Sequence, residues 1–449
     1  MARPPEPTSY KASCGKPGLR TTAAVASSRS PKRKEPHLLA IKNLLRSLLA
    51  APHVAYVSSY PPRKCGIATF TRDVAACVAK LMPLGHRFVV AVNDNHRGYA
   101  YPALVRKQIE RDVASSYDDA ASYVSDSHCR VVNIQHEYGL FGGLWGSHLL
   151  RFMDRVRQPI ALTLHTVLPD PDPVLLSVTQ ALIARSATTI VLAQSAIDIL
   201  TRDYAVSSAK LRFIPPGVPN VRRVPEAKAK RALGLDGRTV LATCGLMNPG
   251  KGIQYAIDAL AALVDEFPDV VYLVVGQTHP GVKATSGEAY RQELEAQVQR
   301  LGLSNHVRFD NRYLSYRELV LHLLATDVYI VPYLNLTQVV SGTLAYALGC
   351  GRAIVSTRST YAQEVLADGR GELVDVRDAG SLSAAIGRIL RDPVYKANVQ
   401  QRAYTFGHQM IWPAVARAYT QAYEDVCDDQ QSPAGFAVRR ALSEVAIPA

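Results

Sequence analysis

From residue 53 onward, short apolar runs alternate with segments of helical periodicity, and this alternation constrains the fold more than any other feature. Continuous apolar strands separated by helices are typical of a parallel sheet that is covered on both faces. In the first half of the chain the pattern predicts a doubly wound α/β domain. Its predicted strands are 53–58, 87–92, 130–134, 159–164 and 188–193, and its predicted helices are 68–81, 145–156, 175–186 and 194–203.

The pattern stops over residues 215–228, where four prolines and a glycine predict a linker. It then starts again, which predicts a second doubly wound domain. Two such domains joined by a short linker are expected to face a cleft. The predicted strands of the second domain are 239–243, 270–275, 306–309, 327–331 and 353–356, and the predicted helices are 251–265, 287–301, 315–325, 342–349, 379–391, 393–403 and 410–427.

Basic residues are concentrated at the N-terminal end of the chain. Of the formal net charge of +13, residues 1–50 contribute +8, because they hold ten Lys or Arg against Glu6 and Glu35. Pro, Ser and Lys dominate residues 1–36, which predicts a disordered, solvated leader, and residues 38–50 predict a short amphipathic helix. A basic leader can also bind an anionic membrane surface. No specific nucleic-acid partner is expected.

The sequence shows neither a secretory signal peptide nor an apolar run long enough to span a bilayer. An odd number of scattered cysteines, without a Cys-x-x-Cys pair, is typical of reduced thiols in the cytosol. We therefore expect a cytoplasmic protein, with peripheral contact to the inner face of the membrane if the leader binds lipid. The seven cysteines are at positions 14, 65, 77, 129, 244, 350 and 427.

Ligands of doubly wound sheets bind at the carboxyl ends of the strands, so the loops that follow the strands hold the candidate residues. The first loop lacks the Gly-x-Gly-x-x-Gly fingerprint of dinucleotide binding. Its single glycine, Gly66, predicts a place where a ligand approaches the backbone of Gly66 and Ile67, or simply a turn. His136 and His165 each follow a buried strand, so we expect them to face the cleft, with a buried structural role as the alternative.

An Asp-x-Asp pair follows the fourth of these strands. Asp170 and Asp172 alternate with three prolines, which is typical of a turn. We therefore interpret the pair as a turn and predict no metal site.

Two loops of the second half predict an anion site. Gly245 follows a strand and allows a ligand to approach the backbone closely. Lys251 is predicted to lie in the first turn of a helix, where its charge opposes the helix dipole unless an anion is bound beside it. Ser341, Gly342 and Thr343 open another predicted helix, whose first N–H groups attract anions. Together, Lys251 and this helix start predict a diphosphate site.

These motifs resemble those of retaining glycosyltransferases of the GT-B fold, in the large family numbered four. The resemblance covers residues 53–427. It implies two Rossmann-like domains facing a cleft, with a nucleoside diphosphate sugar held chiefly by the second domain and the acceptor against the first. The motifs that carry it are YPPRKCGIATF, LHT, GLMNPGKG, VVGQTHP, SGTLAYALGCGRAIVST and MIWPAVARAY.

The resemblance also implies a domain organisation, in which the last helix crosses back to the first domain. The expected parts are a leader at 1–50, an acceptor domain at 51–216, a nucleotide-sugar domain at 217–408, the crossing helix at 409–428 and a tail at 429–449.

The implied activity is that of a hexosyltransferase. It would transfer a hexosyl group from the nucleotide sugar to a hydroxyl of a saccharide or lipid-linked acceptor, with retention and with neither a metal ion nor a further cofactor. Lys251 and the start of the 342–349 helix would stabilise the leaving diphosphate. His165 would bind the sugar or the diphosphate, and Gln338 would bind a sugar hydroxyl.

The chain departs from the family pattern in the donor loop. The family has two glutamates eight positions apart, and the matching positions here are Gln338 and Tyr346. An arginine is usual near the family's lysine, but Leu246 and Met247 occupy that place. Tyr346 is therefore predicted to contact the donor through its phenol, with a packed core aromatic as the alternative.

Two other functions fit the same fold. A nucleotide-sugar epimerase needs acid–base carboxylates in the cleft, and Glu137 is the first-domain candidate for such a group on the acceptor side. A transferase that has lost activity and serves as a binding or scaffold protein would explain the missing glutamates. The retained Lys251, His165 and helix start favour the transferase.

Overall fold

The computed structural model describes residues 53–222 and 225–429. The predicted leader at 1–50 and residues 430–449 of the predicted tail lie outside these residues. The described part belongs to one compact unit that begins at Ala50. It contains two parallel β-sheets, one of seven strands and one of six.

The first sheet has the strand order β3-β2-β1-β4-β5-β6-β7, and all of its strand pairs are parallel. Its strands are β1 Val54–Ser58, β2 Arg87–Asn93, β3 Val105–Glu110, β4 Val131–His136, β5 Ile160–Leu164, β6 Thr188–Val191 and β7 Leu211–Phe213. Its helices are α2 Gly66–Leu81, α3 Ala114–Ser125, α4 Leu149–Arg155, α5 Pro173–Arg185 and α6 Gln194–Asp203, with short 3-10 turns at Leu144–Gly146 and Ser208–Lys210.

The second sheet has the order β10-β9-β8-β11-β12-β13, again entirely parallel. Its strands are β8 Thr239–Cys244, β9 Val270–Val275, β10 Val307–Asp310, β11 Val328–Val331, β12 Ala353–Thr357 and β13 Glu372–Val374. Its helices are α7 Glu226–Ala232, α8 Ile253–Ala261, α9 Pro280–Ser286, α10 Ala289–Arg300, α11 Tyr316–Ala325, α12 Gly342–Gly349, α13 Thr360–Val365, α14 Ala379–Arg391 and α15 Pro393–Gly407, with 3-10 turns at Pro249–Lys251 and His408–Met410.

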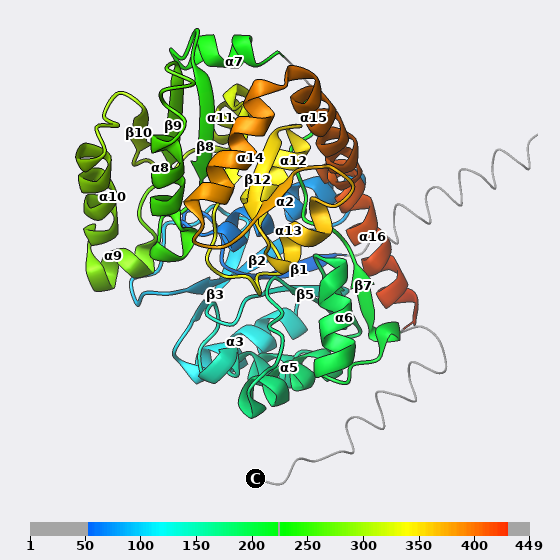
Figure 1. The fold of residues 1–449 in the computed structure, drawn as a ribbon. Coiled ribbons are helices and arrows are strands. Elements are labelled where there is room, and N and C mark those ends of the chain that lie inside the picture. Colours follow the sequence, from blue (N-terminus) through cyan, green and yellow to red (C-terminus); the bar gives the residue numbers. More distant parts are fainter. Residues whose placement is uncertain (1–52, 223–224, 430–449) are drawn as a thin grey trace, which may run out of the picture. The chain divides into compact units, whose positions relative to one another are not determined.

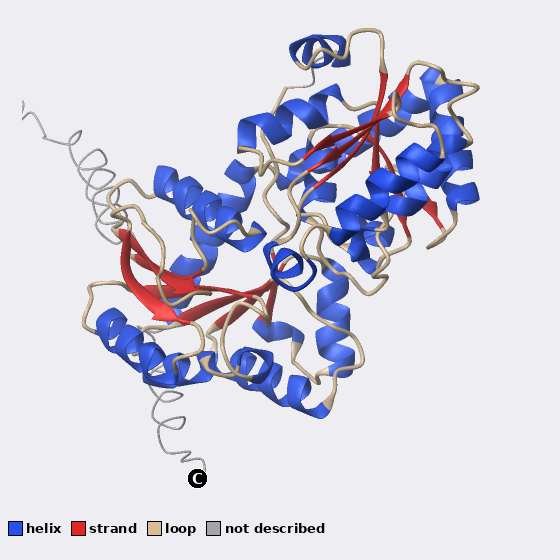
Figure 2. Cartoon of the chain, turned by 90° about the vertical axis from the view of Figure 1, so that its left-hand side faces the viewer, coloured by secondary structure: helices blue, strands red, loops and turns tan. Residues whose placement is uncertain are grey.

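Each sheet is packed on both faces, as the continuous apolar strands predict. In β1 and β9, for example, every residue is buried. Separate apolar clusters lie on the two faces of each sheet, where helices cover the strands (Figures 1 and 2). The predicted doubly wound architecture is therefore confirmed for both halves of the chain.

The last helix, α16 Trp412–Asp429, packs against the first sheet rather than the second. Its apolar side joins the cluster of β1 and α2, and the Tyr419 hydroxyl shares a 3.2 Å hydrogen bond with Thr163 of β5. The chain thus passes between the sheets twice. The two passing segments lie side by side, because the Val218 N–H donates to Met410 O and the Trp412 N–H donates to Val218 O.

Other contacts join the two halves on the side of the strand carboxyl ends. The Glu364 carboxylate of α13 accepts hydrogen bonds at 2.9 Å from the N–H groups of Gln194 and Ser195, at the start of α6. Free N–H groups at a helix start attract a carboxylate, so this contact closes an otherwise uncapped helix. Lys64 also donates to Gln277 across the same side at 3.1 Å.

Several elements differ from the prediction. Strand β3 was not predicted, because four of the six residues of its sequence VRKQIE are polar or charged and it lies at the edge of the sheet. Helix α3 is rich in Ser and Asp, which favour turns, and it is held by the burial of Tyr117 and small neighbours. Helix α7 begins inside the predicted linker. The short elements β7, α9, α13 and β13 were also missed, since they have too few residues to show a period.

Candidate functional site

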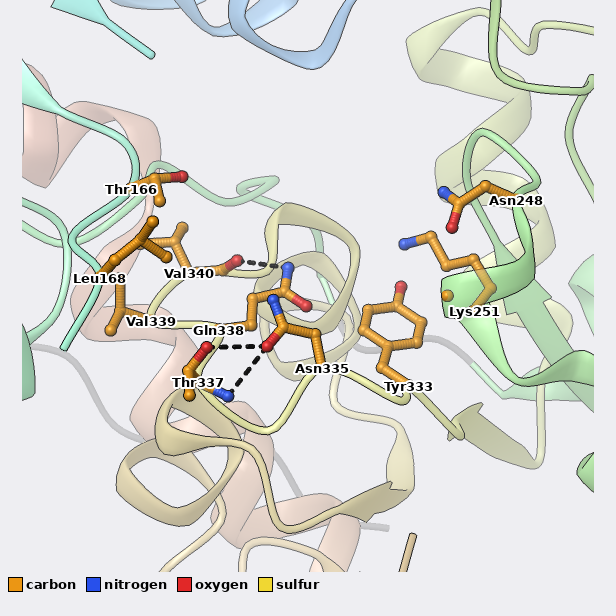
Figure 3. Close-up of a pocket in the computed structure, with 11 residues that line it drawn as sticks. Thr166, Leu168, Asn248, Lys251, Tyr333, Asn335, Thr337, Gln338, Val339 and Val340 are labelled. Atoms are coloured by element: carbon orange, nitrogen blue, oxygen red, sulfur yellow. Dashed lines mark hydrogen bonds between the residues drawn. The ribbon is translucent and has the colours of Figure 1, made fainter. Parts of the chain in front are cut away.

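A cavity of about 280 Å³ lies among loops that follow strands of both sheets. Neutral polar side chains, three aliphatic side chains and one lysine surround it (Figure 3). The first sheet contributes the loop after β5, and the second contributes the loops after β8 and β11. The lining residues are Thr166, Leu168, Asn248, Gly250, Lys251, Tyr333, Asn335, Thr337, Gln338, Val339 and Val340.

Lys251 is the cation of this cavity. It is the last residue of the 3-10 turn, and Gly252, at φ 62°, separates it from α8. The prediction that Lys251 lies in the first turn of the helix is therefore wrong, because the left-handed glycine starts α8 at Ile253. Within the described ranges, its ammonium group forms no ion pair with a carboxylate. Its Nζ instead lies 3.7 Å from the centre of the Tyr333 ring.

The predicted neighbours of Lys251 are brought together. A Cβ placed on Gly245 would lie 3.9 Å from Lys251 Nζ and 3.6 Å from Thr343 Cγ2, so all three residues surround one point. Gly245 has φ 127°, which a residue with a side chain rarely adopts. Open backbone at this point allows a ligand group to approach between the lysine and the start of α12.

Helix α12 begins as predicted, with Ser341 as its N-cap. The Ser341 side chain does not cap the helix, and the first helical bond runs from the Ala345 N–H to Ser341 O. The N–H groups of Gly342 and Thr343 precede that bond and have no partner within the helix. Gly342 is exposed, and nothing lies within 4 Å of the place its Cβ would take. The start of α12 can therefore receive an anion.

Gln338 lies in the cavity, where its amide orientation is fixed. Its Nε2 donates to Val340 O at 2.7 Å (Figure 3). This bond uses one of the two Nε2 hydrogens, so the amide oxygen Oε1, which accepts hydrogen bonds, and the second Nε2 hydrogen are the groups that Gln338 can offer to a ligand. Its backbone is held as well, because the Tyr361 N–H donates to Gln338 O.

His165 is nearly buried, with 8 % of its surface exposed, directly before Thr166 of the cavity wall. Its Nε2 lies 2.8 Å from Gln135 Oε1. Gln135 Nε2 donates to Asn133 Oδ1, and Asn133 Nδ2 donates to the carbonyl of Ala161. Because a carbonyl only accepts, this chain makes Gln135 Oε1 an acceptor and His165 Nε2 the donor.

Burial lowers the pKa of His165 to about 3, so the ring is neutral near pH 7. In a neutral ring with the proton on Nε2, Nδ1 has no proton and can only accept a hydrogen bond. His165 can therefore recognise a hydroxyl, but it offers no N–H to a phosphate.

His136 does not line the cavity. It is fully buried, stacked on Phe141 with ring centres 5.7 Å apart, and neither ring nitrogen has a hydrogen-bond partner. Burial lowers its pKa to about 3 as well. The expectation that His136 faces the cleft is therefore not met, because the loop after β4 folds over it with Tyr138 and Phe141. The structural alternative fits its position.

Glu137 reaches the cavity wall through a neighbour. Its Oε2 accepts a 2.7 Å hydrogen bond from the Thr166 hydroxyl, and its Oε1 accepts one from the Tyr138 N–H. Removal of the carboxylate from water raises its pKa. On the same side of the molecule, Gly66 is the first residue of α2 with open space beside it, and Ile67 packs against the core of the first sheet.

Tyr346 is not among the residues that line the cavity. It lies on α12 and meets the Tyr316 ring edge-on, with ring centres 6.2 Å apart, and burial raises its pKa. Its contacts match the core-aromatic alternative. Tyr333 was missed by the sequence reasoning. The available signal was its place two residues after β11, at the carboxyl end of a central strand.

The Asp-x-Asp pair lies in the loop that leads into α5, with Asp170 at a bend. Asp172 caps α5 by accepting from the N–H groups of Val174 and Leu175. In the described part of the chain, no group of three or more His, Cys, Asp or Glu side chains could hold a metal ion. Over the same residues, no helix is both long enough and apolar enough to cross a membrane.

Residues 226–406 match the family model for glycosyl transferases group 1. This part of the chain is therefore similar to group 1 glycosyltransferase domains. The structure resembles that of Anabaena HepE in complex with UDP and glucose, with a TM-score of 0.67, 16% identity and coverage of 83% of this chain and 100% of that one. It resembles sucrose-phosphate synthase of Thermosynechococcus elongatus equally, at 19% identity with coverage of 84% and 99%. The fold is therefore GT-B.

Curated relatives are similar over part of their length. A GDP-mannose-dependent alpha-(1-6)-phosphatidylinositol monomannoside mannosyltransferase of Mycolicibacterium smegmatis is 31% identical over 196 residues, which is 41% of this chain and 48% of that protein. A D-inositol 3-phosphate glycosyltransferase of Corynebacterium jeikeium is 29% identical over 239 residues, or 51% and 54%. The chain spans about half the length of the curated relatives it matches.

Proposed function

We propose that this chain is a hexosyltransferase that moves a hexosyl group from a nucleoside diphosphate sugar to a hydroxyl acceptor, with retention of configuration. The observation that carries the proposal is the Lys251 ammonium, which pairs with no carboxylate among the described residues and lies beside Gly245 and the start of α12. A lysine and free N–H groups that converge on one point suit a diphosphate. The relatives named above as mannosyl- and glycosyltransferases support the class of reaction.

The proposed role of this site is electrostatic. Negative charge grows on the diphosphate as the glycosidic bond breaks, and donors already in place stabilise it without moving. Lys251 supplies a full positive charge, and the N–H groups of Gly342 and Thr343 supply hydrogen bonds at the helix start. The donor's diphosphate would lie across these groups, with its sugar toward Gln338.

The neutral residues would recognise hydroxyl groups. Gln338 Oε1 and His165 Nδ1 can both accept a hydrogen bond from a sugar hydroxyl. This assignment narrows the sequence-based proposal for His165 from the sugar or the diphosphate to the sugar. Glu137, held by Thr166, would accept a hydrogen bond from the acceptor on the first-domain side.

We infer that the acceptor is a saccharide, an inositol or a lipid-linked polyol. The inositol part of this inference rests on the acceptors printed in the names of the relatives. The cavity itself is compatible with such an acceptor, since apart from Lys251 its lining is uncharged. A cytoplasmic location, contact of the leader with an anionic membrane, and independence from metal ions and cofactors remain parts of the proposal.

A binding protein without turnover is the second candidate. It is favoured by Gln338 and Tyr346, which stand where the resemblance leads one to expect two glutamates. One experiment separates the candidates. The purified chain is incubated with UDP- and GDP-hexoses, with and without inositol or inositol phosphate, and released UDP or GDP is measured by chromatography.

The transferase proposal expects release from at least one donor, faster in the presence of an acceptor, and an NMR spectrum that shows a retained anomer. Binding of UDP or GDP without release from any donor would support the second candidate. A chain that binds neither nucleotide and releases neither would contradict both.

A further inference from the structure

Tyr333 occupies a fixed place beneath the proposed diphosphate site. It follows β11 by two residues and is buried, with 2 % of its surface exposed. The Thr357 hydroxyl donates to Tyr333 O at 2.7 Å. On its other side, the Leu334 N–H donates to Gly250 O at 2.9 Å, which joins the segment after β11 to the turn after β8.

Gly252 brings these two segments into backbone contact. A Cβ on Gly252 would lie 2.0 Å from Pro332 O, closer than any real side chain could lie. The turn that ends at Lys251 therefore rests directly on the backbone around Tyr333. This contact leaves the Lys251 side chain above the Tyr333 ring, with Nζ 3.7 Å from the ring centre (Figure 3).

The ring and the hydroxyl of Tyr333 contact different parts of the site. An ammonium group over an aromatic face is held by the ring's quadrupole, more strongly where water is excluded. The hydroxyl shares a 3.1 Å hydrogen bond with Thr343 Oγ1, at the start of α12. One side chain thus contacts both the lysine and the helix start.

A lysine side chain has many rotamers, and holding it in one of them costs conformational entropy. In the described part of the chain no carboxylate pairs with Lys251, so the Tyr333 ring is the group that orients it. Orientation matters here because Lys251 is the only cation in the lining of the cavity. A preorganised charge stabilises a transition state at no cost of reorganisation during the reaction.

We propose that Tyr333 is a positioning residue. Its ring holds Lys251 and its hydroxyl holds Thr343, so that Lys251 and the start of α12 bind the same diphosphate. The inference rests on the proposed function, since it assumes a diphosphate at that point. Tyr333 itself need not touch the substrate. Its ring acts through Lys251, so most of the effect of losing the ring should disappear when Lys251 is removed, and only the contribution of the hydroxyl through Thr343 should remain.

The test is a double-mutant cycle of Tyr333→Leu and Lys251→Ala, with release of nucleoside diphosphate from the best donor as the readout. Tyr333→Leu is expected to lower kcat about tenfold with a smaller change in donor KM, the size of a partly desolvated cation–π contact. In the Lys251→Ala background, the same change should have an effect below about twofold. Tyr333→Phe retains the ring and should recover most of kcat.

The matched control is Tyr272→Leu, which removes another buried tyrosine whose hydroxyl bonds a threonine, in β9. Melting temperatures are measured for all variants, and kcat is compared well below the lowest of them. If Tyr333→Leu does not fold, Tyr333→Met takes its place, because methionine fills space without an aromatic face.

Equal losses for Tyr333→Leu and Tyr272→Leu, or the same loss with and without Lys251, would overturn the inference while leaving the proposed function intact. A wild-type chain that binds neither UDP nor GDP would overturn both. A chain that binds one of them without turnover overturns only the proposed reaction. The Kd of that nucleotide is then measured for the same four proteins of the double-mutant cycle. Non-additive losses of affinity support the role of Tyr333, and additive losses of affinity exclude it.

Discussion

The two halves of the site differ in how their polar groups are satisfied. On the second-domain half, Lys251 lines the cavity and the start of α12 lies near Lys251 and Gly245, with a charge and N–H groups that no residue of the described chain neutralises. On the first-domain half, His165 is held neutral by burial and bonded to Gln135, and Glu137 is bonded to Thr166. One half is prepared for an anion, and the other has already satisfied most of its polar groups.

This difference indicates how the proposed work is divided between the halves. An unpaired charge in a partly closed cavity costs free energy unless a ligand of opposite charge binds beside it. We therefore expect such a charge where it stabilises the transition state most. Neutral hydrogen-bonding groups discriminate shape and hydroxyl position at little electrostatic cost. Charge stabilisation is thus expected from the second-domain half and selection among hydroxyl groups from the first.

Lys251→Ala tests the charged half and should have the largest effect. We expect kcat for the best donor to fall about 10²–10³-fold, the cost of removing one preorganised donor to a developing charge. Donor KM should change less, because the lysine matters most when the bond breaks. Lys228→Ala, an exposed lysine on α7, is the control and should leave both constants unchanged. Near-normal turnover of Lys251→Ala would break the comparison.

The two buried histidines of the first domain, one of them in the neutral half of the site, predict a dependence of stability on pH. His136 and His165 have pKa values lowered to about 3 by burial, whereas in the unfolded chain they titrate near 6.5. Below pH 6.5 the unfolded chain binds protons that the folded chain does not, so the free energy of unfolding falls as the pH falls. From pH 7.5 to 5.5, each histidine should contribute a loss of about 1.4 kcal/mol.

Urea unfolding of the wild type and of His136→Leu at the two pH values measures this contribution. The variant should lose less stability on acidification, by about the share of one histidine. His96→Leu serves as the control, since the side chain of His96 is 86 % exposed. An identical loss in wild type and His136→Leu would show that the pKa of His136 is the same in the folded and the unfolded chain, so that burial does not keep this histidine neutral.

Tyr346→Phe tests whether the charged half of the site extends to Tyr346, and we expect it to have the smallest effect. The change removes only a hydroxyl from a ring that packs against Tyr316. Donor KM, kcat and the melting temperature are expected to stay within about twofold and about 2 °C of wild type, as for substitutions away from functional contacts. A weaker affinity for the donor at unchanged stability would place Tyr346 in the site after all.

The sequence predicted the central parts of the fold because burial leaves a periodic signal. The five-residue strand β1 and the helix α12 are apolar where they pack, and both lie within a residue of their predicted bounds. Edge elements have no such signal. Four of the six residues of β3 are polar or charged, since it lies at the edge of the sheet, and the Ser- and Asp-rich α3 is held by the burial of Tyr117 and its small neighbours.

The site shows the same division. Gly245, Lys251 and Thr343 could be grouped from the sequence, since topology places the loops after central parallel strands at one edge. The conformation of Gly252 could not be foreseen, so the expected helical position of Lys251 was wrong. The burial of His136 depends on how a glycine-rich loop folds over it, and the proton arrangement of His165 depends on three other polar groups. Such contacts leave no periodic trace.

The paired segments at Val218 and Ile411 carry a mechanical consequence. Two domains joined by one connecting segment can rotate about any axis. Two connecting segments that are hydrogen-bonded side by side resist twisting, so bending is the motion that costs least. Trp412 lies at this pivot, and a Cβ on Gly217 would come within 2.3 Å of its ring. We therefore expect the two halves of the site to open and close by rotation about one axis. That axis is set by the two connecting segments, whose residues do not belong to the site.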